Sequence, residues 1–422
     1  DALPSACERD RALCEDVRRY LDRYMNRYGV TQARVEGAVT SGDSAATMPN
    51  SHGEPVDSAW RVAASGYFQP NDHIIVSAGG IAYDGHAAPT GSLLSIGFDF
   101  AQLDIGYRDH WLSPLTDSSS LISTQAPTMP SITLSNYDPI SPLGISYEVF
   151  LAQASRQDGI VFEEGTTSGR PRIAGVQLGI EPTAGYALAV NRITQYGGGA
   201  RNTGGFSQFI DALTESQNPV TDASGETEEF GNQVASITSS MLVDAKIPFG
   251  VHLEYAGEDN AYAAGYRLGA TNLSVGVDLP QLWKVFDAKF EISEWQNSWY
   301  THHLYPRGLT NHGNVLGHWF GDQRVFGNSI GGRSEMLAVG WRRTSNQYLR
   351  AVYRTMKLDP RWVREGAVPP YDTLHALGLS LATDWQGFPI EVELSGGQDI
   401  FGESFARLSG SIDFSGHAIH RP

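Results

Sequence analysis

The densest group of side chains able to bind a ligand or metal ion lies between residues 302 and 322. It comprises His302, His303, His312, His318 and Asp322. A zinc site needs three or four ligands at about 2 Å with ordered partners behind them, and this spacing matches no zinc motif. Loop histidines with local hydrogen bonds explain the group more simply, so we expect no metal ion and no other cofactor. We expect His312, His318, Trp319 and Asp322 to contact a sugar.

Arg108, Asp109, His110 and Trp111 form a second group, in a row at the end of a predicted strand. Side chains alternate along a strand, so Arg108 and His110 should share one face, with Asp109 and Trp111 on the other. In a sugar site, Trp111 would stack on a pyranose ring while Asp109 accepts hydrogen bonds from hydroxyl groups. The simpler interpretation is an interfacial tryptophan beside a structural salt link.

The run Gly197–Gly199 lacks the GK[ST] ending of a phosphate-binding loop, so backbone flexibility is its simpler use. Arg201, which follows it, could form a two-pronged contact with the carboxylate of an acidic sugar. Glu228 and Glu229 lie in an acidic stretch and are expected to be solvated.

The signals for catalysis are weak. No Gly-x-Ser-x-Gly elbow is present, although Ser146 or Ser155 could meet a distant histidine in space. Glu391 and Glu393 would share one strand face about 7 Å apart, yet charges facing a wet interior explain them more simply. The adjacent pair Glu163 and Glu164 is no more specific. We therefore expect a protein that is not an enzyme.

Composition excludes some classes of function. Of the 422 residues, 41% are hydrophobic but only 18% are charged, and the chain has 46 glycines. This suits a β-rich protein whose surface does not face water on every side. The net charge of −17 argues against a nucleic-acid partner, which requires clustered lysine and arginine. No stretch approaches the roughly 18 apolar residues of a transmembrane helix, so any membrane crossing must use strands.

The N-terminal part differs from the rest of the chain. Leu13, Val17 and Leu21 recur at helical spacing within residues 5–28, which predicts one amphipathic helix. Cys7 and Cys14 are close enough in sequence to suggest a disulfide in an oxidising compartment, provided that the chain turns between them. The start shows no signal peptide, so an exported protein would be in its mature form.

The period changes to two from Trp60 onward. Apolar residues alternate with polar or small ones in several runs, for example in 94–100, 174–180, 249–255, 273–279, 390–394 and 408–414. Such alternation is typical of strands with one apolar and one polar face. Counting about 9–11 residues for each transmembrane strand plus its connection predicts about 16–18 strands. Short joins near Phe100 and Pro248 contrast with long polar stretches at 197–235 and 298–333, as in outer-membrane barrels.

The predicted organisation is thus an all-β fold, a large antiparallel transmembrane barrel with a small N-terminal helical segment. Residues 1–40 form the helical, periplasmic part; 41–59 a linker; 60–416 the barrel; and 417–422 a tail. A β-propeller or β-helix is less compatible, because no regular repeat of 40–50 residues is visible.

Four segments resemble the Wzi family of capsule-assembly proteins. They are GYRDHWLSPLTDSSSLISTQAPTMPSITLS (106–135), NRITQYGGGARNTGGFSQFIDAL (191–213), YAGEDNAYAAGYRLGATNLSVGVD (255–278) and YPRGLTNHGNVLGHWFGDQ (305–323). The resemblance implies an outer-membrane barrel of 18 strands with a small periplasmic helical part. It also implies a lectin-like role in holding capsular polysaccharide or exopolysaccharide at the surface of a Gram-negative cell. Barrels of this kind commonly end on an aromatic residue, and Phe414 would mark the end of the last strand here.

Three functions remain open from the sequence. The favoured one is attachment of capsular polysaccharide or exopolysaccharide, in contact with outer-membrane lipid. A diffusion porin would share the architecture but needs an open lumen lined by charges. An outer-membrane hydrolase acting on lipid or glycan is the third.

Overall fold

The computed structural model describes residues 21, 26–44, 46–162, 165–201, 209–210, 213, 219–221, 227–258, 269–323, 330–344, 346–359 and 371–415. The strands of its main sheet are β1 (Tyr28–Gly42), β2 (Trp60–Asn71), β3 (Ile74–Tyr83), β4 (His86–Ala88), β5 (Leu93–Phe98), β6 (Ala101–Gly106), β7 (Ser131–Ser135), β8 (Ser146–Gln153), β11 (Arg172–Thr183), β12 (Tyr186–Tyr196), β15 (Gly231–Val243), β16 (Phe249–Glu258), β17 (Thr271–Leu282), β18 (Phe286–Trp295), β21 (Gly332–Thr344), β22 (Gln347–Leu358), β23 (Leu374–Trp385), β24 (Phe388–Gln398) and β25 (Ser404–Asp413). Smaller elements are the hairpins β9 (Gln157–Phe162) with β10 (Gly165–Gly169), β13 (Pro219–Thr221) with β14 (Thr227–Glu229), and β19 (Thr310–Asn311) with β20 (Asn314–Val315), and the 3₁₀-helix η2 (Trp319–Gln323).

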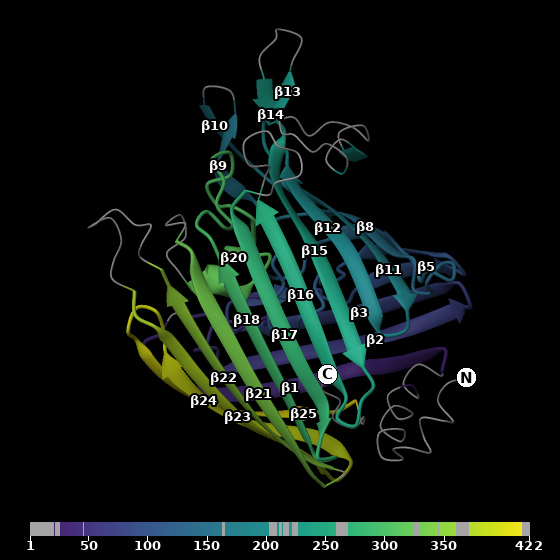
Figure 1. Ribbon diagram of the computed structural model, residues 1–422, viewed down its shortest axis with the longest axis vertical. Coiled ribbons are helices and arrows are strands. Elements are labelled where there is room, and N and C mark those ends of the chain that lie inside the picture. The colour runs from purple at the N-terminus through teal and green to yellow at the C-terminus, as the bar shows by residue number, and fades with distance from the viewer. Residues whose placement is uncertain are drawn as a thin grey trace.

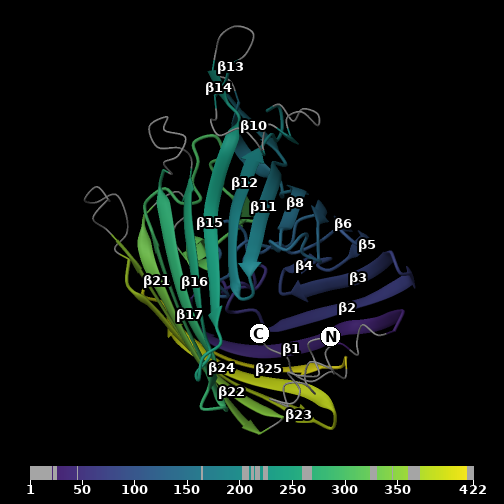
Figure 2. The same ribbon diagram turned by 45° about the vertical axis from the view of Figure 1, so that its right-hand side comes forward.

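The main sheet closes on itself. The strands of this sheet pair antiparallel in the order in which they follow one another along the chain, with β4 as the exception, and β1 completes the ring by pairing with both β2 and β25. The described sheet has 19 strands, but β4 and β5 both pair with β3 and occupy one position. The wall therefore has 18 positions, which confirms the all-β barrel and the favoured strand number. Figures 1 and 2 show these strands side by side and strongly tilted.

The wall is apolar outside and polar inside. On β23, Leu377, Leu379 and Leu381 are 40–47% exposed, while Gly378 and Ser380 between them face the interior. The next strand repeats the pattern, with Val392 and Leu394 outside and Glu391 and Glu393 inside. A water-soluble protein has the reverse arrangement, with apolar side chains inside and polar ones outside. An apolar outer face is favourable only when it contacts hydrocarbon. Among the described residues, no helix is long and apolar enough to cross a membrane.

The two ends of the barrel differ. At one end tight turns join the strands, for example Gln386-Gly387 between β23 and β24, where both residues have positive φ, as a type I′ turn requires. Exposed aromatic residues gather near this end, and they include Trp283, Trp385 and Phe414. They form the aromatic girdle that anchors such barrels at an interface. The last strand ends at Asp413, next to Phe414, as predicted.

Long connections leave the other end, and some of them fold back into the lumen. We call residues 107–130, between β6 and β7, the first inner segment, and residues 296–323, between β18 and β21, the second inner segment. Both consist largely of buried residues, and the second includes Trp299, Tyr300 and Tyr305, which have no exposed surface. In Figure 1, β20 lies behind the front wall of the barrel. Small apolar residues of the inner wall, such as Ala152 and Ala256, pack against the inner segments.

The predicted boundaries need two corrections. The wall begins at Tyr28 rather than at residue 60, because β1 supplies a full strand to the sheet. The expected linker 41–59 includes the end of β1. Described residues of the remainder contact the β24–β25 connection and the wall: Ser44 donates a hydrogen bond to Asp399 at 2.9 Å, and Arg407 of β25 donates to the carbonyl of Ser58. The helix expected at 5–28 lies almost wholly outside the described residues, as do Cys7, Cys14 and the tail 417–422.

The outward face of β23 provides a test of membrane contact. Replacing Leu379 by arginine should lower the free energy of unfolding in lipid vesicles by about 2–4 kcal/mol, because a charge near the middle of the hydrocarbon is poorly solvated. Leu379→Ala, which removes the side chain without adding charge, should lower it by less than Leu379→Arg. Urea titration with tryptophan fluorescence measures both. Equal stability of the two variants would contradict a lipid-facing Leu379.

Candidate functional site

Carboxylates of the inner wall hold the first inner segment in place. Glu254 of β16 accepts a hydrogen bond from the amide of Ser120 at 3.1 Å. Glu291 of β18 accepts hydrogen bonds from the amides of Thr116 at 2.8 Å and Asp117 at 2.9 Å. These contacts satisfy backbone groups that are buried away from water, where an unpaired amide would be unfavourable. The inner segment is therefore fixed to the wall at several successive residues.

Asp117 also connects the two inner segments with the wall. One of its carboxylate oxygens accepts hydrogen bonds from Nε and Nη2 of Arg354 on β22, at 2.8 and 2.6 Å, and the other accepts one from Nε1 of Trp319 at 3.1 Å. Burial by itself would raise the pKa of Asp117, but the adjacent Arg354 guanidinium holds it below the ordinary value. Asp117 is therefore an ionised carboxylate with charge-assisted partners.

The predicted sugar-binding residues His318, Trp319 and Asp322 lie inside this packing. His318 and Trp319 are each 1% exposed. The Nδ1 atom of His318 accepts from the amide of Phe320 at 3.2 Å, and Nε2 lies 3.3 Å from the hydroxyl of Ser334. Burial lowers the pKa of His318 to about 3, so the ring is neutral. These two side chains hold the inner segments together rather than facing a polymer.

Asp322 has a similar structural setting. Its carboxylate accepts hydrogen bonds from the amide of Val315 at 2.8 Å and from the side chain of Gln125 at 2.7 Å. The latter bond joins the second inner segment to the first. Burial raises the pKa of Asp322 to about 7.

The row of residues 108–111 follows β6 rather than lying within it. Arg108 and His110 turn to the same side, because both contact Glu148, at 2.6 and 2.7 Å, so the predicted sharing of a face is found. Asp109 contacts Nε2 of His52 at 3.0 Å. Trp111 donates from Nε1 to the carbonyl of Leu115 at 2.9 Å, which places it in the first inner segment rather than in an aromatic belt.

Of the remaining candidates, Arg201 is 7% exposed and donates to the carbonyl of Val161 at 3.0 Å, which ties the β9–β10 hairpin to the end of β12. Glu391 and Glu393 lie on the inner face of β24, as expected, and Glu391 accepts from Arg34 at 3.0 Å. Glu163 and Glu164 lie outside the described residues, and no side chain is described for Glu228 or Glu229.

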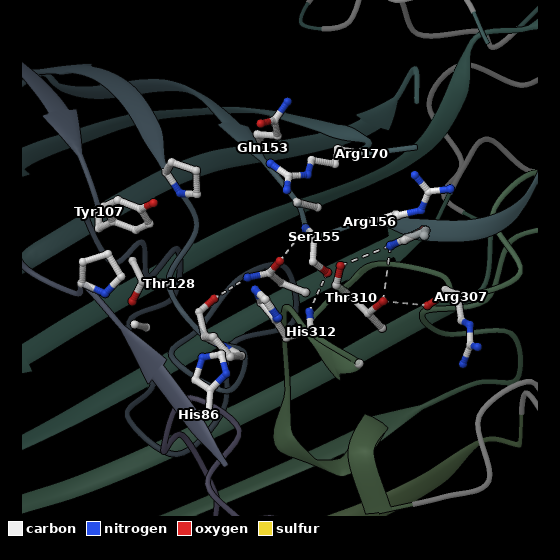
Figure 3. Close-up of a pocket in the computed structure, with 18 of the residues that line it drawn as sticks. His86, Tyr107, Thr128, Gln153, Ser155, Arg156, Arg170, Arg307, Thr310 and His312 are labelled. Carbon is white, nitrogen blue, oxygen red and sulfur yellow. Dashed lines mark hydrogen bonds between the residues drawn. The ribbon is translucent and has the colours of Figure 1, made fainter. Parts of the chain in front are cut away.

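One predicted residue, His312, lines an open cavity at the long-loop end of the barrel. The cavity has a volume of about 670 Å³. It lies between β4, the first inner segment, the β8–β9 connection and the β19–β20 hairpin (Figure 3). Its floor is fixed by hydrogen bonds: Asn311 donates to the carbonyl of Pro127 at 2.7 Å and accepts from the amide of Ser155 at 2.7 Å. A polar hollow of this size suits a small ligand or one residue of a polymer.

The charge of the cavity is opposite to that of the whole protein. Arg156, Arg170 and Arg307 line it, with Asp158 as the only lining carboxylate among the described residues. Asp158 lies 3.5 Å from Nε of Arg156. Within the described part of the chain, no ion pair at contact distance is found for Arg170 or Arg307, although Arg307, like Arg156, lies near enough to Asp158 for an electrostatic interaction with that carboxylate. In Figure 3, Arg170 lies beside Gln153, whereas the side chains of Arg156 and Arg307 lie apart from it and from each other at the right-hand edge of the cavity.

Ser155 and His312 meet in this cavity, as the hypothesis of a serine hydrolase would require. The contact is nevertheless between the Ser155 hydroxyl and the backbone amide of His312, at 2.7 Å. The His312 ring instead packs edge-on against His86, with the ring centroids 5.0 Å apart. A nucleophile needs its hydroxyl proton directed at a base, and this arrangement directs an amide proton at the hydroxyl.

Sequence reasoning missed His86, Arg156, Arg170 and Arg307. His86 comes from β4 and the three arginines from three separate connections, and no motif or spacing relates them. The one available signal was that Arg307 lies in the long polar stretch 298–333 of a strongly acidic chain.

The closed wall, the aromatic girdle and the long-loop end define an outer-membrane β-barrel, here with segments folded into its lumen. The solved structure of Escherichia coli Wzi is similar, with a TM-score of 0.70 at 16% identity, and the match covers 96% of this chain and 88% of that one. That protein is described as a carbohydrate-binding β-barrel of the outer membrane involved in group 1 capsule assembly. A model of the family "Capsule assembly protein Wzi" matches residues 59–397, so this chain belongs to the Wzi family.

Two further solved structures share the fold more distantly. OccK3 (OpdO) of Pseudomonas aeruginosa has a TM-score of 0.54 at 9% identity, with 93% of this chain and 97% of that one covered. OccAB4 of Acinetobacter baumannii has a TM-score of 0.51 at 10% identity, with 92% and 97% covered. A search of curated protein sequences gave no match.

The buried His318 predicts a dependence of stability on pH. Its pKa is near 3 when folded and near 6.5 when unfolded, so between these values the unfolded state binds the extra proton. The contribution of His318 to stability should therefore fall as pH decreases below 6.5, by up to about 1.4 kcal/mol per pH unit.

The measurement is urea unfolding in detergent micelles between pH 7 and pH 4.5. His318→Gln should show a shallower loss of stability than the unchanged protein, whereas His303→Gln, at an exposed ring, should not. Parallel pH profiles for His318→Gln and the unchanged protein would show that His318 is not held neutral.

Proposed function

We propose that this protein sits in the bacterial outer membrane and attaches capsular polysaccharide or exopolysaccharide to the cell surface in a lectin-like way. The observation that carries the proposal is the combination of an occupied lumen with a polar cavity at the long-loop end. Long connections of outer-membrane barrels face the outside of the cell, where capsule lies. A barrel built in this way can hold a polymer at its outer end.

Membership of the Wzi family supports the same function, because the family is described by capsule assembly. A carbohydrate-binding barrel of similar fold adds to this support. The occupied lumen favours attachment over the porin alternative, which needs an open path through the barrel. Ser155 and His312 lack the geometry of a nucleophile and its base, so attachment is also favoured over hydrolysis.

Weak single contacts are sufficient for such a role. A repeating polymer presents the same sugar many times, and many copies of the protein lie in one membrane. Each additional contact then forms at high effective concentration, so the polymer as a whole is held tightly. Of the side chains predicted from the sequence, His312 in the cavity is the one we retain as a sugar contact.

The proposal predicts a specific phenotype. Cells that lack the protein should make a normal total amount of polysaccharide, but most of it should appear in the culture medium instead of on the cells. Quantifying uronic acid or total hexose in cell and medium fractions measures this. A plasmid carrying the unchanged gene should restore attachment. Unchanged cell-bound polysaccharide in the deletion strain would overturn the proposal.

A further inference from the structure

The cavity at the long-loop end differs electrostatically from the molecule around it. The protein has a net charge of −17, so a polyanion approaching it meets overall repulsion. Salt at physiological strength limits that repulsion to about 8 Å, and the local charge then decides what binds. In the cavity the local charge is positive, because Arg156, Arg170 and Arg307 outnumber Asp158.

The three arginines reach the cavity from different parts of the fold. Arg156 belongs to the β8–β9 connection, Arg170 to the β10–β11 connection, and Arg307 to the second inner segment. Hydrogen bonds hold these connections together. The side chain of Gln157 donates to the carbonyl of Thr310 at 3.2 Å, and the backbone amide of Ala154 donates to the carbonyl of Pro171 at 3.0 Å. These bonds join the segments that carry the three arginines, so Arg156, Arg170 and Arg307 line one cavity from connections that are held together rather than from independent loops.

The other lining groups suit a sugar ring. Tyr107 presents an aromatic side chain, and Gln153, Thr128 and Thr310 present groups that exchange hydrogen bonds with hydroxyls (Figure 3). Guanidinium groups bind carboxylates through two parallel N–H···O bonds, and a hydrated monovalent anion gains less from this geometry. A ligand that satisfies both parts of the lining carries a carboxylate on a hydroxylated ring.

We propose that this cavity binds an acidic sugar residue of the polysaccharide, such as a uronate, with Arg170 contacting its carboxylate and with Arg156 and Arg307 adding positive charge at the edge of the cavity. Rings of the chain that carry no carboxylate lie against Tyr107 and the neutral side chains. The inference rests on the proposed function and names the chemical class of sugar that the cavity selects.

The test compares two polymers on the detergent-solubilised, full-length protein. One is the capsular polysaccharide of the strain that encodes the chain; the other is the same polymer after carbodiimide activation and borohydride reduction, which turns each carboxylate into a neutral hydroxymethyl group. Biolayer interferometry on immobilised protein should show binding of the native polymer that is roughly tenfold or more tighter than that of the reduced polymer. Rising salt should weaken only the native interaction.

Variants assign this preference to the cavity. Arg170→Gln with Arg307→Gln should weaken binding of the native polymer about as much as carboxyl reduction does, and should leave binding of the reduced polymer unchanged. Arg333→Gln is the matched control, since Arg333 is an exposed arginine at the same end of the barrel but outside the cavity. Heat-modifiable migration on gels verifies that each variant is folded.

The outcomes separate the two proposals. Equal binding of native and reduced polymers by the unchanged protein would overturn the acidic-sugar inference and leave attachment standing. The same holds if the double variant retains full affinity for the native polymer. If neither polymer binds, the proposed function itself fails, and the inference fails with it.

Discussion

Two carboxylates on the inner wall, Glu254 and Glu291, hold the segment that fills the lumen, and most of the architecture depends on this contact. A wall of hydrogen-bonded strands leaves an interior that is lined by polar groups, and these must be satisfied by water or by protein. Here the amides of Thr116, Asp117 and Ser120 satisfy them. Arg354 then adds the charge that stabilises Asp117 in the same segment. Without these bonds, the 107–130 segment would leave several amides unpaired in a dry interior.

The second inner segment is held mainly by packing. The ring of Phe320 stacks on Trp295 of the wall with centroids 3.6 Å apart, and Trp319 reaches Asp117. Aromatic burial of this kind is favourable and directional, so the segment has one preferred position. It also carries the β19–β20 hairpin that forms one wall of the cavity. The packing inside the barrel thus positions the polar groups that face outward at the long-loop end.

The alternation of side chains made the barrel predictable from the sequence. In the run 377–381, leucines alternate with small or polar residues, and this alternation predicts a strand with one apolar face. β1 was missed, because its outward positions combine valines with small residues such as Ala33 and Gly37, and the signal there is weak.

The site was harder to predict, for a physical reason. His318 and Trp319 are types of residue that often contact sugars, and their burial depends on how a whole loop folds back into the lumen. Trp299, Tyr300 and Tyr305 in that loop indicate burial, since an exposed loop seldom carries so many aromatic residues. The arginines of the cavity come together only through tertiary structure, so no spacing in the sequence could have grouped them.

Conductance through a planar bilayer tests most directly whether the inner segments occupy the lumen. Purified protein inserted into a planar bilayer in concentrated salt should give no steady conductance steps of the size that open porins produce. As a positive control, a variant with residues 110–126 deleted and replaced by a short glycine-serine linker should open the path and conduct. Steady, large steps from the unchanged protein would contradict the filled lumen, and would return the porin to first place among the possible functions.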